Sequence, residues 1–201
     1  MKILAFTDMH GSLQALRSIE KKVKKLNPDI LVCAGDISIF EHGIAGIIRR
    51  LSRLGKKVII VHGNHEDAST FNRYSKIYKN VVFIHKNYVF AEDVLFLGYG
   101  GGGFSSVDRE FENVAIKKFK KAIEENKGKK TVLLTHAPPY KTRLDSLDNG
   151  HCGNKSIRHF AEKNEVDILI CGHLHENFGK EDKIKKTRVI NPGPFGKILV
   201  L

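Results

Sequence analysis

Tryptophan is absent from the sequence, and aromatic residues make up only 8% of its 201 positions. A hydrophobic core must therefore be built mainly from isoleucine, leucine, valine and phenylalanine. The hydrophobic fraction of 41% and the charged fraction of 28% are typical of a soluble globular chain. A chain of this length can bury a large core.

Cysteine is also scarce, with Cys33, Cys152 and Cys171 as its only instances. Their number is odd and no Cys-x-x-Cys pair exists, which argues against a disulfide framework or a cysteine-bound zinc ion. Cys33 and Cys171 fall inside apolar runs and are expected to be buried thiols. This cysteine usage fits a reducing compartment.

Long apolar runs are missing. No segment approaches the roughly 20 apolar residues that span a membrane, and the run at residues 1–8 is too short for a signal peptide. We therefore expect a cytoplasmic protein without a membrane partner. The sequence shows no internal repeat or linker, so residues 1–201 are predicted to form one domain.

Acidic residues are outnumbered, 22 against 34 lysines and arginines, which gives a formal net charge of +12. Such a balance favours anionic partners such as phosphate compounds or nucleic acid. However, the lysine runs at 21–25 and 117–121 fall on predicted amphipathic helices, where a solvated face explains them. Nucleic acid is therefore a possible partner but not the favoured one.

Buried strands alternate with helices along most of the chain. Apolar, unalternated runs at 2–6, 30–34, 57–61, 131–135 and 166–171 are typical of parallel strands covered on both faces. Helices are predicted from Ser12 as N-cap to Leu26, around 44–51, and over 108–126 and 154–163. Short runs at 81–84, 88–90 and 94–97 predict antiparallel hairpins. The pattern indicates an α/β fold.

Polar residues follow five of these strands at the point where each strand ends. They occur in the segments Thr7-Asp8-Met9-His10, Gly35-Asp36, Gly63-Asn64-His65-Glu66, His136-Ala137-Pro138 and Gly172-His173-Leu174-His175. The carboxyl ends of parallel strands lie along one edge of a sheet, where ligands bind in open α/β sheets. Residues i and i+2 of an extended segment point to the same side, so Asp8 pairs with His10 and His173 pairs with His175.

These donors favour a metal site. A mixed set of imidazole and carboxylate ligands suits Mn, Fe, Zn, Co or Ni better than Ca or Mg, which prefer oxygen ligands. The set is too large for one tetrahedral zinc ion. It matches two ions roughly 3.5–4 Å apart that share a bridging carboxylate.

In this order, the motifs resemble the calcineurin-like metallophosphoesterase superfamily, and the resemblance extends from residue 8 to Asn191-Pro192-Gly193. It implies a four-layer α/β/β/α sandwich with two divalent metal ions. One ion would be held by Asp8, His10, Asp36 and His175, and the other by Asp36, Asn64, His136 and His173. Asp36 would bridge the two, and His65 would lie beside them without binding.

The finer resemblance is to the small cyclic-nucleotide phosphodiesterase-like branch, through residues 135–140 (THAPPY) and 150–153 (GHCG). Protein serine/threonine phosphatases carry a further Asp-Arg-Gly after Gly-Asp, whereas this chain continues as Ile37-Ser38-Ile39-Phe40. The missing aspartate leaves His65 without its usual carboxylate orienter, and the missing arginine removes a phosphate clamp. Protein phosphatase activity is therefore not expected.

The resemblance predicts a metal-dependent phosphoric ester hydrolase that acts on small phosphodiesters or phosphomonoesters by means of a metal-activated hydroxide. Asn64 would contact metal and phosphoryl oxygen, and His65 would protonate the leaving group. Two alternatives are a nuclease with the same centre and a non-catalytic phosphoryl-binding scaffold. The complete ligand set and the retained His65 favour catalysis.

Substrate contacts are predicted in the long polar loop at 140–152, where Tyr140, Arg143 and His151 are the candidates. The glycine-rich segment at 98–103 is expected to form a flexible wall of the site. The sequence leaves the native metal, the physiological substrate and the oligomeric state open.

Overall fold

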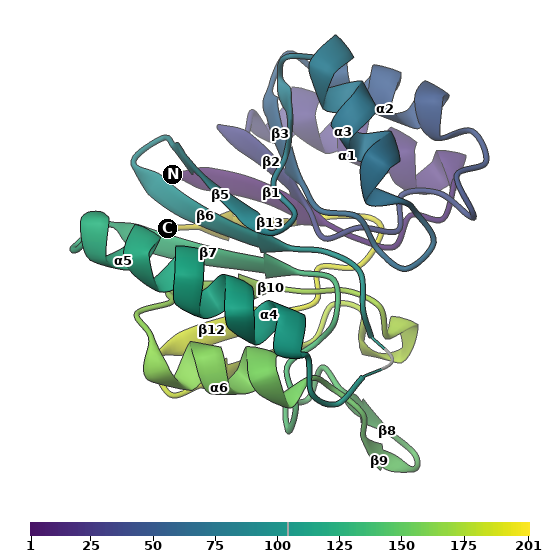
Figure 1. Cartoon of the computed structure of the whole chain (residues 1–201). Coiled ribbons are helices and arrows are strands. Elements are labelled where there is room, and N and C mark those ends of the chain that lie inside the picture. Colours follow the sequence, from purple (N-terminus) through teal and green to yellow (C-terminus); the bar gives the residue numbers. More distant parts are fainter. Residues whose placement is uncertain (104) are drawn as a thin grey trace.

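Two β-sheets lie face to face in the computed structural model, and helices cover the outer face of each (Figure 1). The structure describes residues 1–103 and 105–201. The first sheet has the order β13-β1-β2-β3-β4 and the second β11-β12-β10-β7-β6-β5. The predicted four-layer α/β/β/α sandwich is confirmed.

The first sheet and its helices come almost entirely from the first half of the chain. The strands are β1 (Lys2–Phe6), β2 (Ile30–Cys33), β3 (Lys57–Ile60), β4 (Val81–Phe83) and the C-terminal β13 (Lys197–Val200). The helices are α1 (Leu13–Leu26), α2 (Ile44–Ser52) and α3 (Ala68–Ile77). Because β13 runs antiparallel to β1, the two chain termini lie side by side.

The second sheet and its helices follow. The strands are β5 (Asn87–Ala91), β6 (Val94–Tyr99), β7 (Lys130–Thr135), β10 (Ile168–Ile170), β11 (Glu181–Ile184) and β12 (Thr187–Ile190). The covering helices are α4 (Arg109–Val114), a π-helical turn η1 (Ala115–Phe119), α5 (Lys120–Glu125) and α6 (Lys155–Lys163). A small hairpin, β8 (Ser146–Leu147) with β9 (Gly150–His151), projects below the second sheet, and a 3₁₀ turn η2 spans His175–Asn177.

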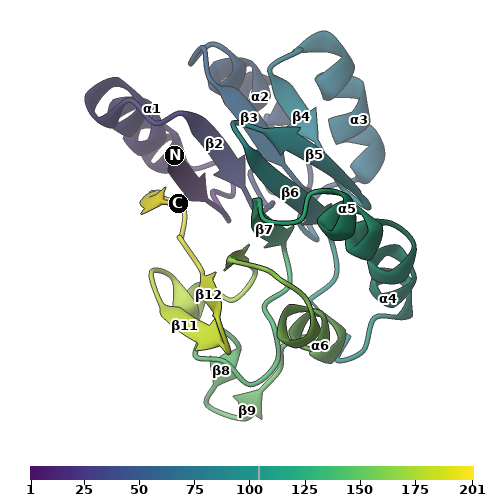
Figure 2. The ribbon, with the colours of Figure 1, turned by 90° about the vertical axis from the view of Figure 1, so that its left-hand side faces the viewer.

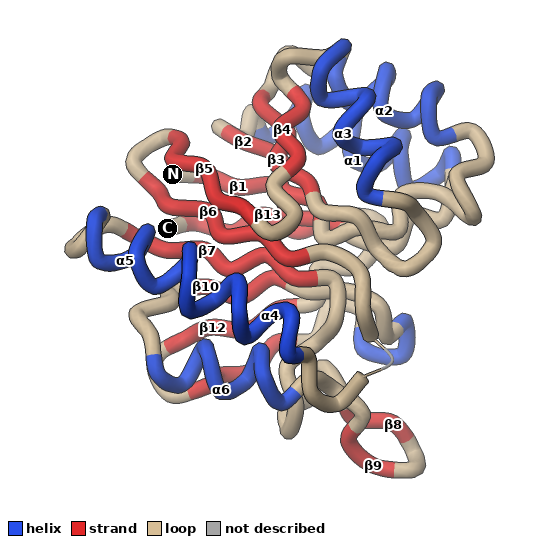
Figure 3. The backbone as a smooth tube through the Cα atoms, in the orientation of Figure 1, coloured by secondary structure: helices blue, strands red, loops and turns tan. Residues whose placement is uncertain are grey.

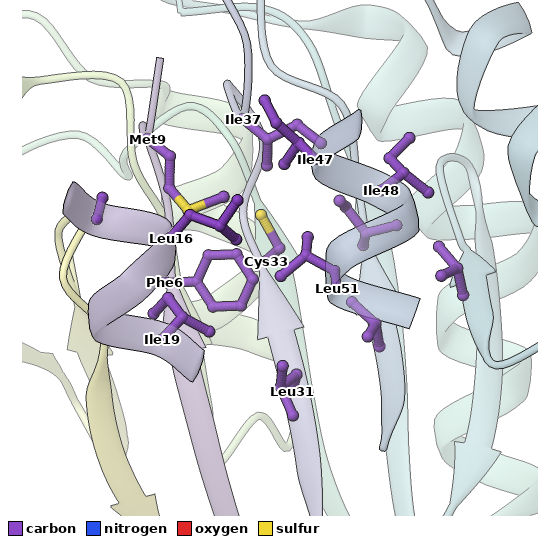
Figure 4. Close-up of a cluster of buried hydrophobic side chains, with 14 of the residues drawn as sticks. Phe6, Met9, Leu16, Ile19, Leu31, Cys33, Ile37, Ile47, Ile48 and Leu51 are labelled. Carbon is purple, nitrogen blue, oxygen red and sulfur yellow. The ribbon is translucent and has the colours of Figure 1, made fainter. Parts of the chain in front are cut away.

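The strands are apolar on both faces because both faces are covered. In β1, Leu4 and Phe6 pack under the helices of the first sheet, whereas Ile3 and Ala5 face the second sheet. Figure 4 shows the outer part of this packing, with Phe6 and Cys33 beneath α1 and α2. Such two-sided burial explains the unalternated runs in the sequence. Figure 2 shows the helical layers on opposite sides of the paired sheets.

Local signals in the sequence set several boundaries. The Ser12 hydroxyl accepts a hydrogen bond from the Ala15 N–H at 3.2 Å and begins α1, as predicted. The predicted helix at 108–126 is present as the continuous run α4–η1–α5. Cys33 and Cys171 are buried as predicted. No helix in the described part of the chain is both long and apolar enough to cross a bilayer.

Two predictions about elements were wrong or incomplete. The run at 81–84 does not form a hairpin with the next strand, because β4 pairs in parallel with β3 while β5 pairs with β6 in the other sheet. A short connection can either reverse the chain or carry it across to a facing sheet, and periodicity does not distinguish the two. Helix α3 was not predicted, since Thr70 and Phe71 are its only fully buried residues and leave no apolar stripe.

Candidate metal centre

The seven predicted ligands converge from both sheets. Loops after β1, β2 and β3 carry four of them, and loops after β7 and β10 carry three; these loops leave the sheets on the same side of the molecule (Figure 3). The ligands are Asp8, His10, Asp36, Asn64, His136, His173 and His175. Across the two groups, His10 Nε2 lies 3.0 Å from His175 Nε2. The prediction of a single sheet edge was therefore wrong, because the cluster closes between the edges of two stacked sheets.

Backbone geometry turns these residues inward. Asp8, His10, Asp36 and His173 have φ angles of 50°, 44°, 50° and 71°. They are left-handed rather than extended, so the same-side argument for positions i and i+2 does not describe how they meet. Left-handed non-glycine residues cost about 1–3 kcal/mol each and gather at functional sites.

The Asp8 carboxylate is anchored at its base. Its Oδ2 accepts hydrogen bonds from the Thr7 hydroxyl at 2.7 Å and from the His173 N–H at 3.1 Å, and the same N–H lies 3.2 Å from Oδ1. Its Oδ1 lies 3.7 Å from His175 Nε2 and 4.0 Å from His10 Nε2. The anchoring contacts fix the carboxylate so that Oδ1 faces the cluster.

Asp36 has one anchored oxygen, and its other oxygen faces both halves of the cluster. Its Oδ1 accepts a hydrogen bond from the His65 N–H at 2.9 Å. Its Oδ2 lies 3.8 Å from His10 Nε2 and 3.4 Å from His136 Nε2. One oxygen atom thus lies between a histidine of the first sheet and a histidine of the second.

His136 is held with its lone pair toward the cluster. The buried ring donates from Nδ1 to the Ala34 carbonyl at 2.8 Å, which leaves the lone pair of the neutral ring on Nε2. That Nε2 lies 3.0 Å from Asn64 Oδ1, which is also 2.9 Å from His173 Nδ1. Two acceptor atoms, His136 Nε2 and Asn64 Oδ1, therefore point at each other, an arrangement that needs a proton or a cation between them.

The electrostatics of the cluster also call for a cation. Asp8 and Asp36 are only 3% and 2% exposed, and within the described residues their ion-pair partners are histidines rather than lysine or arginine. Burial lowers the pKa of His10 and of His173, which favours neutral imidazoles. Contact with Asp8 raises the pKa of the more exposed His175. Two buried carboxylates among imidazoles fit divalent metal ions.

The mutual pKa shifts of Asp36 and His136 also favour a cation at the cluster. Burial opposes ionisation of Asp36, but its contacts with His136, His65 and His10 together lower the pKa of the carboxyl. Burial likewise opposes protonation of His136, but Asp36 raises its pKa. A metal ion would compete with the proton that these two groups share.

The motif glycines allow the loops to approach one another closely. A Cβ atom on Gly63 would collide with the Asp36 carboxylate, and one on Gly172 would collide with Thr7 Oγ1 and Asp8 Oδ2. Any side chain at either position would displace a predicted ligand.

Glu66 is a residue whose role the sequence analysis missed, although it stands in the Gly63–Glu66 motif. The buried carboxylate accepts hydrogen bonds from the N–H groups of Ser38 at 2.8 Å, Asp36 at 3.0 Å and Gly63 at 3.1 Å. Burial raises its pKa. Glu66 ties the loop after β2 to the loop after β3, and so holds Asp36 beside Asn64.

His65 lies at the side of the cluster. Its ring centroid is 4.8 Å from that of His10 and 4.7 Å from that of Phe40. One nitrogen of His65, one of His10 and an Asp36 oxygen all lie within 4.8 Å of one another. Its buried Nδ1 has no hydrogen-bond partner among the described residues. His65 is thus close enough to act on a group bound at the cluster.

The structure does not bring the three candidate substrate contacts into contact with the cluster. His151 donates from Nδ1 to the buried Asp145 carboxylate at 2.8 Å, and the Tyr140 ring lies 6.0 Å from the His151 ring. The Arg143 backbone N–H donates to Asp182 at 2.8 Å. Their role as substrate contacts stays a prediction.

The glycine-rich segment lies beside the loop after β3. The Gly101 N–H donates a hydrogen bond to the His62 carbonyl at 2.9 Å. His62 precedes the Gly63–Glu66 motif, so the position of the segment agrees with a wall near the cluster.

Comparison with known proteins shows the family of this chain. The sequence model of the calcineurin-like phosphoesterases matches residues 1–177. A protein of Methanocaldococcus jannaschii, named uncharacterized protein MJ1162, is 33% identical over 203 residues, which cover 96% of this chain and 88% of that protein.

Solved structures share the fold. The protein TT1561 of Thermus thermophilus superposes with a TM-score of 0.75 at 18% identity, covering 96% of this chain and 89% of the other. A protein described as a novel archaeal phosphodiesterase gives a TM-score of 0.56 at 19% identity, with coverages of 96% and 84%. At these identities the likeness shows the arrangement of sheets and helices.

Proposed function

Because this chain belongs to the calcineurin-like phosphoesterase family, we propose that it hydrolyses small phosphate esters with the help of two divalent metal ions. The observation that carries the proposal is the position of Asp36 Oδ2, 3.8 Å from His10 Nε2 and 3.4 Å from His136 Nε2. A single carboxylate oxygen between two groups of donors suits a bridging ligand.

The donors divide naturally into two sets. Asp8, His10 and His175 offer ligand atoms within 4.8 Å of one another. Asn64 Oδ1 lies within 3.0 Å of both His136 Nε2 and His173 Nδ1. We assign one ion to each set and Asp36 to both. The ions would be Mn, Fe, Ni, Zn or Co, given the nitrogen-rich donors.

When bound, such ions lower the pKa of a water molecule and offset the negative charge of the phosphoryl group. The residues of the chain supply orientation and a proton. The Thr7 hydroxyl and the His173 N–H hold Asp8, the His65 N–H holds Asp36, and the Ala34 carbonyl holds His136. As the water oxygen forms a bond to phosphorus, the bond from phosphorus to the leaving oxygen breaks, and His65 donates a proton to that oxygen.

The distribution of charge supports a small substrate. The lysine runs at 21–25 and 117–121 lie on α1 and on η1–α5, which cover the outer faces of opposite sheets. They do not form one basic face around the cluster, as a nuclease groove would require. Because one structural neighbour is described as a phosphodiesterase, diesters are the first substrates to test.

The proposed metal-dependent hydrolysis is tested by removing the metal ions and adding them back. The protein is treated with chelator, then supplied with Mn, Ni, Zn or Mg, and assayed on p-nitrophenyl phosphate and bis-p-nitrophenyl phosphate. We expect the stripped protein to be inactive and Mn or Ni to restore turnover. Calcium is the matched control, because it prefers oxygen ligands and should restore little.

Thermal unfolding of the same samples gives a readout independent of turnover. An activating ion present at about 100 times its Kd should stabilise the fold by about 2.7 kcal/mol. Undiminished turnover in excess chelator would contradict the proposal. Turnover on DNA that falls steeply with salt would favour the nuclease instead.

A further inference from the structure

A tight turn follows the Asp36 loop. The His42 N–H donates to the Ile39 carbonyl at 2.9 Å, and these two residues form an isolated antiparallel bridge. The central residues, Phe40 and Glu41, have φ angles of 45° and 65°. Positive φ at both central positions is typical of a type I′ turn, which favours asparagine and glycine.

Phe40 is therefore unusual in two ways. A bulky aromatic residue adopts a left-handed backbone conformation that normally disfavours it. Its side chain is also 70% exposed, so packing in a core does not explain its presence. Strained conformations persist where the surrounding structure enforces them, and they gather at functional sites.

The surroundings fix the turn beside the cluster. Glu41 Oε1 accepts a hydrogen bond from the Asp67 N–H at 2.9 Å, which ties the turn to the start of α3. The Phe40 ring lies 4.7 Å from the His65 ring at an angle of 46°, and the His65 ring lies 4.8 Å from that of His10. The His65 ring thus lies next to both Phe40 and His10, a predicted metal ligand.

We propose that Phe40 is a stacking surface for the leaving group, and that the protein prefers phosphate esters whose leaving group carries a planar aromatic or heteroaromatic ring. The inference rests on the proposed function, in which His65 gives its proton to the leaving oxygen. The remainder of the leaving group extends past His65 toward the exposed face of Phe40. Aromatic rings gain from offset or edge contacts with one another beyond simple burial of area.

Paired esters test this preference. Benzyl phosphate and cyclohexylmethyl phosphate release primary alcohols of similar acidity and size, but only one alcohol is aromatic. The corresponding methyl diesters form a second pair. We expect kcat/KM for the benzyl member to fall about fivefold to tenfold in Phe40→Ala, with little change for the cyclohexylmethyl member.

Phe40→Tyr should retain the preference for the benzyl ester. An equal loss on both members of a pair, or no loss on either, would overturn the inference while leaving the proposed function intact. If these esters and the nitrophenyl esters all stay intact under every metal, the proposed function fails, and the binding measurement below still tests the stacking surface.

The thermal stability of a Phe40 variant distinguishes a role in substrate stacking from a role in supporting the fold. In Phe40→Gly the turn receives a residue that adopts positive φ freely, so we expect the midpoint of thermal unfolding to rise by about 2 °C. The same variant should lose the preference for the benzyl ester. A fall in the midpoint would show that Phe40 supports the fold instead.

The absence of tryptophan from the sequence supplies a direct probe. Phe40→Trp introduces a single tryptophan, which can be excited selectively, at the proposed stacking surface. Phe90→Trp places one at a residue of comparable type on β5, where the native side chain is 44% exposed. We expect 4-nitrobenzyl alcohol to quench the Phe40→Trp emission saturably and the Phe90→Trp emission only by collision. Identical quenching in both variants would overturn the inference.

Discussion

Asp36 and Asp145 are both buried carboxylates, but they are satisfied in different ways. Asp145 accepts hydrogen bonds from the backbone N–H groups of Thr142 at 2.7 Å, Gly153 at 2.9 Å and Lys141 at 3.0 Å, and from His151 at 2.8 Å. Both of its oxygens are occupied. Asp36 has one oxygen held by a backbone N–H, while the other faces two histidines.

The difference separates a structural carboxylate from one suited to bind metal. Asp145 closes the loop at 139–153 on itself and needs nothing more. Asp36 leaves a charged, buried oxygen beside ring nitrogens that can present lone pairs, a costly arrangement without a cation. Burial alone does not show whether a carboxylate is structural or binds metal. The groups that face its two oxygens, backbone N–H groups or histidine nitrogens, do show it.

Replacement of Asp36 should have the largest effect on activity. In Asp36→Asn we expect kcat/KM to fall by at least about 10³-fold, more than the roughly 10–100-fold cost of losing an outer-shell partner. The charge that would bridge the ions is removed while the shape is kept. Steady-state kinetics with saturating metal measure this, and Asp148→Asn, at an exposed position of the loop, is the control. Near-normal turnover in Asp36→Asn would show that Asp36 is not a bridging metal ligand.

Replacement of His65 should affect rate without affecting metal. We expect His65→Ala to lower kcat by about 10²-fold or more, because the leaving oxygen loses its proton donor. Metal content per chain should stay unchanged. His159→Ala, on the exposed face of α6, is the control. Loss of metal together with activity would show that His65 is a ligand instead.

Replacement of Asp145 should affect stability. In Asp145→Ala the three backbone N–H groups lose their acceptor, and we expect a loss of about 2–4 kcal/mol in the free energy of unfolding. Urea denaturation measures it, with Asp148→Ala as the control in the same loop. A loss below about 0.5 kcal/mol would show that the loop is held by other contacts.

The contrast between Asp36 and Asp145 also explains which residues of the candidate site could be predicted from the sequence. Asp8, His10 and the later histidines were predictable because each follows an apolar strand within a recognisable motif. Asp145 and Glu66 were not, because the fate of an acid depends on which N–H groups the folded loops direct at it. The assignment of β4 and β5 to different sheets could not be predicted for a similar reason. Two short apolar strands with a tight connection fit a hairpin as well as a crossing from one sheet to the other.

Glu181 shows a third way to satisfy an acid and should have the smallest effect. Contacts with Arg188 and then Lys197 lower its pKa to about 2 from 4.5. Because the pKa is lower in the folded state, the stabilisation is complete above about pH 4.5 and is lost as the pH falls toward 2. We expect a contribution of about 1 kcal/mol or less, since the pair is partly exposed.

Thermal unfolding at pH 5 and pH 3 tests this for the native chain and for Glu181→Gln. The native chain should lose slightly more stability between the two pH values than the variant does. Equal losses would show that the contacts of Glu181 do not stabilise the fold.

Anomalous diffraction from crystals grown with manganese shows whether Asp36 bridges two metal ions. We expect two anomalous peaks roughly 3.5–4 Å apart with Asp36 Oδ2 between them. A single peak, or peaks that do not contact Asp36, would contradict a bridging role for Asp36.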